Sequence, residues 1–279
     1  MKYLSIRKLH YITQRKKHNE INNDIDDWLF SPYHCLKVRF FIELSAILAN
    51  FLQHTPIKPN FITLLFAMSP VIGSILLSSG EANLIIAGVL VFFFYGIFDW
   101  TDGILARVTK KTSTLGIVLD TWAGLVGSFS FLIGLGMYLF NATLEIHFIY
   151  IMILIIIIRA LDLKNFVYHH AMYNFYKNYK FRQKKNKKKT KVDKKDRNLS
   201  KKLIFLKNFF QSFLDDRART VDTIGLIILI ELTYDQIILM NFIYYLFLVK
   251  VLAIFAGGFY LVFFKGFAEK INSSLNKIS

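Results

Sequence analysis

The chain has 279 residues, of which 54% are hydrophobic, and its 35 Lys and Arg outnumber its 19 Asp and Glu to give a formal net charge of +16. The apolar residues gather in long runs, which excludes a soluble globular domain and indicates a membrane protein with several spans. A single cysteine, Cys35, excludes an internal disulfide and a cysteine-based metal site.

Two segments precede the first span. Residues 1–36 are polar and charged, without the apolar core of a signal peptide, and we expect them to form a cytosolic N-terminal segment. Residues 37–54 are apolar on one side but interrupted by Arg39, Glu43 and His54. This pattern favours an amphipathic helix on the membrane surface over a seventh span.

Six apolar runs follow, each about long enough to cross a bilayer with its flanking residues. They cover residues 61–80, 82–98, 117–140, 146–158, 221–233 and 236–264. A second amphipathic surface helix is expected at Leu203–Leu214. The predicted fold is therefore all-α, with six transmembrane helices and one or two interfacial helices. The transmembrane domain covers residues 55–265, and residues 266–279 form a cytosolic tail.

The charges predict the orientation. The connections near residues 81–83, 141–147 and 234–236 contain acidic residues and no Lys or Arg, whereas the other connections are basic. The positive-inside rule then places both termini in the cytoplasm of a cell inner membrane. The basic loop at 177–207 is expected to attract anionic membrane lipids, at about 1 kcal/mol per basic residue near the surface. Nucleic-acid binding is the less favoured interpretation of this loop.

The most informative stretch is Asp99-Trp-Thr-Asp102-Gly-Ile-Leu-Ala-Arg107, which Gly116 and Asp120 follow. An Asp near the centre of a bilayer costs about 2.5–3.5 kcal/mol. Several such residues side by side therefore indicate that a metal, water or a charged ligand compensates their charge. The less favoured interpretation is that they are acids at helix ends whose side chains reach the membrane interface. A transporter that uses such acids as ion sites is an alternative, but it does not explain the small residues in the stretch.

The spacing predicts a phosphate site. Asp99 and Asp102 are three residues apart and share a helix face, and small residues at 103 and 106 keep that face thin. Asp120 opens the next helix and is expected to return to the first pair. Three carboxylates suit a hard cation, Mg²⁺ or Mn²⁺, and Arg107 suits a phosphate. Together they indicate phosphoryl transfer from a diphosphate.

The stretch resembles the signature of the CDP-alcohol phosphotransferases, D-x2-D-G-x2-A-R-x8-G-x3-D-x3-D. The residues in register are Asp99, Asp102, Gly103, Ala106, Arg107, Gly116 and Asp120. Upstream, Pro59-Asn-Phe-Ile-Thr63 is similar to the start of the family's first membrane helix. The resemblance implies a membrane enzyme that moves a phospho-alcohol group from a CDP-linked donor to a lipid or phospho-alcohol acceptor and releases CMP.

The resemblance also implies site residues and a dimer. It implies metal binding by Asp99, Asp102 and Asp120, catalytic roles for Asp102 and Asp120, and donor binding by Gly103, Ala106, Arg107 and Gly116. Members of the family are commonly homodimers. Phospholipid synthesis, or a related synthesis of phospho-alcohols, is the expected context.

One position departs from the signature, because Gly124 stands where the last Asp is expected. The family's final Asp is usually assigned as a metal ligand and as the base that deprotonates the acceptor. Three interpretations remain open. The chain is a scaffold or regulator that binds nucleotide and metal, or its acceptor attacks through an oxygen that is already anionic, or another residue is the base. The candidates for such a base are Asp162, Asp222, His169 and His170.

Other polar residues near the predicted cytosolic side are weaker candidates. Arg217 and Arg219 could hold the phosphate of an acceptor, or they are flanking residues paired with neighbouring aspartates. Arg159 and Asp162 are spaced as an intrahelical ion pair. The glycines of the third span allow close helix packing; they are Gly124, Gly127, Gly134 and Gly136.

Overall fold

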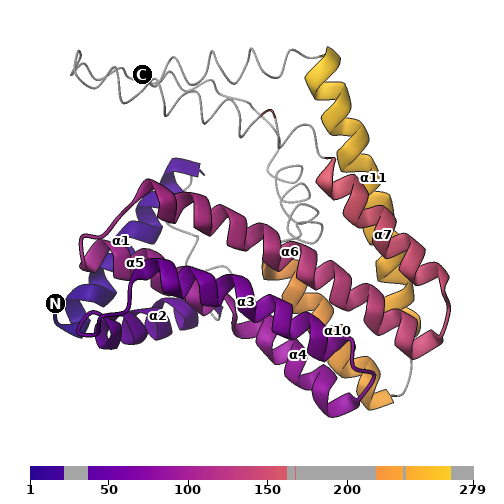
Figure 1. The fold of residues 1–279 in the computed structure, drawn as a ribbon, viewed down its shortest axis with the longest axis horizontal. Helices are drawn as coiled ribbons and strands as arrows, with labels where there is room; N and C mark the ends of the chain where they lie inside the picture. Colours follow the sequence, from indigo (N-terminus) through magenta and orange to yellow (C-terminus); the bar gives the residue numbers. More distant parts are fainter. Residues whose placement is uncertain (22–36, 162–166, 168–217, 235–236, 265–279) are drawn as a thin grey trace, which may run out of the picture. The chain divides into compact units, whose positions relative to one another are not determined.

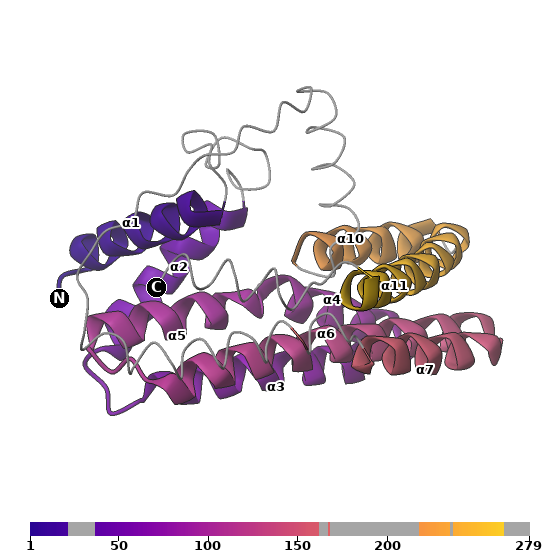
Figure 2. The same ribbon diagram turned by 90° about the horizontal axis from the view of Figure 1, so that it is seen from above.

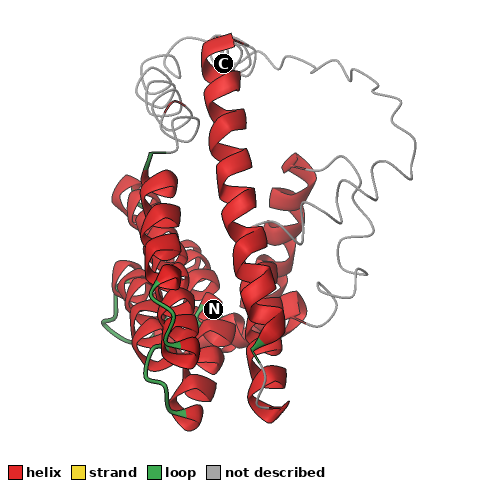
Figure 3. Ribbon diagram, turned by 90° about the vertical axis from the view of Figure 1, so that its right-hand side faces the viewer, coloured by secondary structure: helices red, strands yellow, loops and turns green. Residues whose placement is uncertain are grey.

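The computed structural model describes residues 1–21, 37–161, 167, 218–234 and 237–264. Within these ranges every regular element is a helix, as the colouring by secondary structure shows (Figure 3). The predictions for Leu203–Leu214, for the basic loop at 177–207 and for the tail at 266–279 lie outside the described residues.

The helices are labelled in Figure 1. They are α1 Tyr3–Ile21, α2 Arg39–Leu52, α3 Pro59–Leu77, α4 Ala82–Phe94, α5 Gly96–Val108, α6 Thr114–Thr143, α7 His147–Ala160, α10 Ala218–Tyr234 and α11 Ile238–Phe264. The start of α3 follows from Pro59 at the first helical position, where a missing N–H costs nothing. Ser113 begins α6 by accepting a hydrogen bond from the N–H of Gly116 at 3.0 Å.

In the part of the chain that the structure describes, four helical stretches are long and apolar enough to cross a membrane. These are α3, residues 82–108 of α4 and α5, residues 115–143 of α6, and α11. The all-α membrane class is thus confirmed. Helices α7 and α10 have 14 and 17 residues, so six spans remain a prediction.

One boundary differs from the sequence-based prediction. The second span was expected to end at residue 98, before the acidic cluster, but the helical stretch continues to Val108 with an interruption at Tyr95. Asp99 and Asp102 therefore lie inside a helix. Asp120 likewise lies six residues into α6 instead of at its start.

The chain divides into two compact units. The first contains residues 1–149 and 215–240, and the second contains residues 150–214 and 241–279. In the first unit α3 packs against α4, α5 and α6, while α2 packs against α5 and α1 (Figures 1 and 2). Helix α10 packs against α4. The described helices of the second unit are α7 and α11.

Close approach between α3 and α4 depends on a glycine that the sequence analysis did not single out. A Cβ on Gly88 would lie 2.8 Å from the backbone nitrogen of Leu77 and 2.9 Å from the carbonyl oxygen of Gly73. Both neighbours are backbone atoms that cannot turn away. Small residues at helix crossings let backbones approach in this manner.

Two of the predicted packing glycines in α6 have the same role. A Cβ on Gly134 would lie 3.0 Å from Cα of Ser74 in α3, and one on Gly127 would lie 3.3 Å from the ring of Tyr95. Both predictions are confirmed. Gly124 differs, because no heavy atom would lie within 4 Å of a Cβ there.

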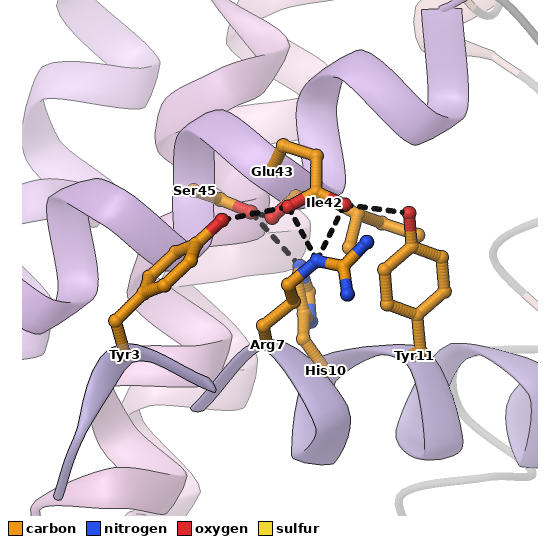
Figure 4. A network of polar contacts seen from close by, with 7 residues as sticks. All are labelled: Tyr3, Arg7, His10, Tyr11, Ile42, Glu43 and Ser45. Carbon is orange, nitrogen blue, oxygen red and sulfur yellow. Dashed lines mark hydrogen bonds and ion pairs between the residues drawn. The ribbon is translucent and has the colours of Figure 1, made fainter. Parts of the chain in front are cut away.

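The N-terminal segment contains a helix that the sequence analysis did not predict. Helix α1 packs against α2, and its Ile6 is fully buried in a cluster with Ile104 and Leu105 of α5. Its Tyr3, Arg7 and Tyr11 all donate hydrogen bonds to Glu43 of α2 (Figure 4). The location of α2 at the membrane surface stays a prediction.

Candidate functional site

Helix α5 carries most of the signature and has two different faces. Ile104 and Leu105 are fully buried against α1 and α2. At 100° per residue, Asp102 and Ala106 lie opposite Ile104, with Leu105 at the border between the two faces, and Asp99 lies on their side of the helix one turn earlier. The local pattern of apolar and polar residues thus turns the acidic face away from the apolar packing.

Asp102 is buried, with 6% of its surface exposed. Its carboxylate accepts a hydrogen bond from the hydroxyl of Thr63 in α3, at 2.6 Å between Oγ1 and Oδ2. Thr63 is itself 3% exposed. A short bond from a neighbouring helix fixes the orientation of this carboxylate and offsets part of the cost of burying it.

The ends of α3, α5 and α6 enclose a cavity of about 180 Å³. Most of its lining is polar or small, and it draws on segments as far apart as residues 59 and 120. The residues that line it are Pro59, Asn60, Thr63, Asp102, Gly103, Ala106, Arg107, Lys111, Thr112, Ser113, Gly116, Ile117 and Asp120. Six of the seven signature residues therefore meet at one place, and all of them belong to the first unit.

The glycines of the signature have visible steric roles at this cavity. The guanidinium of Arg107 lies over Gly103, where a Cβ would come within 3.3 Å of Nη2. A Cβ on Gly116 would lie 3.2 Å from Oγ of Ser113 and 3.4 Å from Oδ1 of Asn60. Larger residues at either position would crowd polar groups of the lining.

The predicted set of three acids is only partly assembled. Asp102 and Asp120 line the same cavity, but Asp99 is not in its lining. Across the described residues, no group of three or more His, Cys, Asp or Glu side chains is close enough to hold a metal ion. The two carboxylates, with the hydroxyls around them, are nevertheless the hard oxygen donors that Mg²⁺ and Mn²⁺ prefer.

Gly124, which stands at the position of the missing aspartate, has free space around it. Gly124 is exposed in α6, four residues after Asp120. Of the alternative bases, Asp222 forms a buried ion pair with Lys37 and is not in the lining of the cavity. The other three, Asp162, His169 and His170, lie outside the described residues.

The two predicted acceptor arginines are not tested. Arg217 lies outside the described residues, and Arg219 is in the first turn of α10, without a described side chain. Asp162, the predicted ion-pair partner of Arg159, also lies outside the described residues. Sequence reasoning missed Ser113, whose signal was a serine directly before the apolar run of α6.

The fold and the cavity together indicate the class of protein: an all-helical membrane protein with a polar, acid-lined site between membrane helices. The model of the CDP-alcohol phosphatidyltransferase family matches residues 57–192. This range includes the whole signature, and the match supports the family that the motif predicted. The family is one of transferases that use a CDP-alcohol as donor of a phospho-alcohol group. No curated protein matches the chain.

Proposed function

We propose that the chain moves a phospho-alcohol group from a CDP-linked donor to a lipid or phospho-alcohol acceptor and releases CMP. The observation that carries this proposal is the single cavity in which Thr63, Asp102, Arg107, Gly116 and Asp120 meet. A cavity of about 180 Å³ is smaller than the 300–1,000 Å³, roughly, of sites for whole small molecules. It fits the diphosphate, with the cytidine and the alcohol outside it.

A divalent cation, Mg²⁺ or Mn²⁺, belongs to the proposal. Asp102 and Asp120 would hold it, because their carboxylates share the cavity. Asp99 stays in the proposed set on the signature alone. When bound, such an ion neutralises the charge of the diphosphate and of the leaving phosphate.

The chain's own residues then have distinct tasks. Arg107 would bind a donor phosphate through its fork of N–H donors, and Gly103, Ala106 and Gly116 would admit the donor by their small size. The acceptor oxygen forms a bond to the β-phosphorus while the bond to the bridging oxygen breaks, and CMP leaves with that oxygen. An acceptor that attacks through an anionic oxygen has no proton to lose, which suits Gly124.

The predicted orientation completes the proposal. Both termini and the cavity face the cytoplasm of a cell inner membrane, where a nucleotide donor is available. The acidic connections at Glu81 and Glu145 would then lie on the other side. Synthesis of phospholipids or related phospho-alcohols and assembly into a homodimer are further parts of the proposal.

A second function is supported by Gly124 itself. Without the last carboxylate, the chain could bind a CDP-linked nucleotide and metal and act as a scaffold or regulator without turnover. General-base catalysis is typically worth about 10²–10⁴-fold in rate. Its loss would leave binding intact, so binding and turnover have to be measured separately.

The test combines a titration with an activity assay. The purified protein is titrated with CDP, with and without Mg²⁺ or Mn²⁺, while its thermal midpoint is followed. CMP release from CDP-linked donors is then measured with a panel of acceptors. Asp102→Asn should abolish the metal-dependent stabilisation, whereas Glu81→Gln, the same change of charge at an exposed position, should preserve it.

The outcomes separate the two functions. Stabilisation by CDP with CMP release supports the transferase. Stabilisation without CMP release on any acceptor supports the scaffold or regulator. No stabilisation of folded protein by CDP overturns both.

A further inference from the structure

A second concave surface lies between α1 and α2, and it shares no residue with the candidate site. It is open and has a volume of about 600 Å³. Arg7 and Tyr11 of α1 and Arg39, Phe40 and Glu43 of α2 line it. This surface is called the α1–α2 concavity below.

The acid in the α1–α2 concavity, Glu43, accepts hydrogen bonds from three donor groups of α1. Each oxygen of Glu43 accepts two: Oε1 from Nε of Arg7 and the hydroxyl of Tyr11, and Oε2 from Nε of Arg7 and the hydroxyl of Tyr3, at 2.7–2.9 Å. The single N–H of Nε is shared between the two oxygens, so three hydrogens occupy most of the about four acceptor positions that a carboxylate offers. The Arg7 guanidinium and the two phenols lower the pKa of Glu43 to about 2, so it stays ionised and satisfied.

The polar groups of the α1–α2 concavity that do not bind Glu43 are hydrogen-bond donors. The terminal nitrogens of Arg7 lie on the Tyr11 side of its Nε (Figure 4), and Cζ lies 5.2 Å from the centre of the Tyr11 ring. The guanidinium of Arg39 has no hydrogen bond or ion pair with any described residue. With two arginines and one glutamate, the lining carries one net positive charge. An ammonium group would meet two like charges and a carboxylate that is already paired, whereas a phosphate would meet two guanidiniums.

One wall of the α1–α2 concavity is apolar and continues onto a membrane-spanning helix. The ring of Phe40 is 43% exposed and lies 6.1 Å from the ring of Phe94, which is 39% exposed. Phe94 belongs to the spanning stretch of residues 82–108. On α2 itself, Ile47 and Phe51 are also exposed. A ligand at this place meets cations and apolar surface together.

We propose that the α1–α2 concavity binds an anionic phospholipid. Its headgroup phosphate accepts hydrogen bonds from Arg39 and from the terminal nitrogens of Arg7, and its acyl chains lie along Phe40 and Phe94. Glu43 is a positioning residue, because it holds Arg7 by Nε and directs the rest of the guanidinium outward. This site depends on neither the transfer reaction nor the metal.

The test measures lipid binding to the purified full chain in discs of phosphatidylcholine, with phosphatidylglycerol added in steps. The number of retained lipids and their affinity are read by native mass spectrometry. Arg39→Gln should weaken phosphatidylglycerol binding by about tenfold or more, as expected for the loss of a charge-assisted pair. Arg39→Lys keeps the charge without the planar fork and should recover only part of the binding.

The matched control is Lys8→Gln, which removes one positive charge from an exposed position of α1 that lies outside the lining. Diffuse attraction of one basic residue to an anionic surface is worth about fivefold or less. Equal losses in Arg39→Gln and Lys8→Gln would overturn the proposal in favour of diffuse attraction. Equal binding of phosphatidylcholine would overturn it too, as would displacement of the lipid by millimolar inorganic phosphate, which would indicate a site for the free anion.

Discussion

Gly124→Asp restores the carboxylate at the last position of the signature and tests the chemistry directly. Gly124 lies in α6, one helical turn after Asp120, and a Cβ at this position meets no heavy atom within 4 Å. The residue is exposed and helical. An aspartate side chain therefore fits without displacing a neighbour.

The expected effects on stability are small and opposed. Replacing a glycine inside a helix by aspartate gains roughly 0.3–0.5 kcal/mol in helix propensity. The like charge of Asp120, four residues earlier, costs about 0.2–0.5 kcal/mol. The thermal midpoint of Gly124→Asp should therefore stay close to that of the original chain, and a change in activity can be read as chemistry.

The expected effect on turnover is large. A positioned general base is typically worth about 10²–10⁴-fold, so CMP release with neutral alcohols as acceptors should rise by about 10²-fold or more. Acceptors whose only nucleophile is a phosphate or carboxylate oxygen should gain little, because they have no proton to lose. The assay compares the two acceptor classes at equal concentration.

Gly124→Asn is the matched control, because it has nearly the same shape and no basic oxygen. If it raises CMP release as much as Gly124→Asp, the effect is steric and the base is not the missing element. If the original chain already uses neutral alcohols as fast as Gly124→Asp does, another base is present. Either result would refute the reasoning about Gly124.

Three further predictions concern helix contacts. Burial, and then the charge of Arg107, lowers the pKa of His10 to about 4. The contribution of the buried, neutral imidazole to the free energy of unfolding is therefore complete above pH 6.5. It should decline by about 3 kcal/mol on acidification to pH 4, and His10→Gln should lose this part of the pH dependence of the thermal midpoint. Thr63→Val removes the donor to Asp102 at nearly constant shape and should lower kcat/KM by about tenfold or more; an unchanged value would mean that this bond does not orient the carboxylate. Gly88→Ala pushes a Cβ against the backbone of α3 and should cost about 1–3 kcal/mol of unfolding free energy, whereas Gly124→Ala should cost none.

The sequence predicted which residues come together better than it predicted the bounds of the helix that carries them. The spacing of Asp102, Arg107, Gly116 and Asp120 was enough to bring these residues to one cavity. The end of the second span was placed at residue 98 because charged residues usually end an apolar run. What the sequence does not show is that the hydroxyl of Thr63 satisfies one of these acids across a helix contact.

The α1–α2 pair shows a second limit of sequence reasoning. Residues 3–21 are polar overall, and α1 has no apolar stripe long enough to predict a packed helix. Its exposed Arg7 pairs with the carboxylate of Glu43, which lies 36 residues away in the sequence. A contact of this kind has no local signal, because both partners are ordinary surface residues until the helices meet.

The two faces of α5 connect these observations. Asp102 and Ala106 line the cavity, while Ile104 and Leu105, between them in the same signature, are fully buried against α1 and α2. The ring of Trp100 also meets the ring of His10 in α1 in a T-shaped contact, with 5.6 Å between centroids. The position of the acids is therefore fixed partly by α1 and α2, which precede the range that the family model matches. A change in the packing of α1 would displace the acidic face of α5 without touching a residue of the cavity.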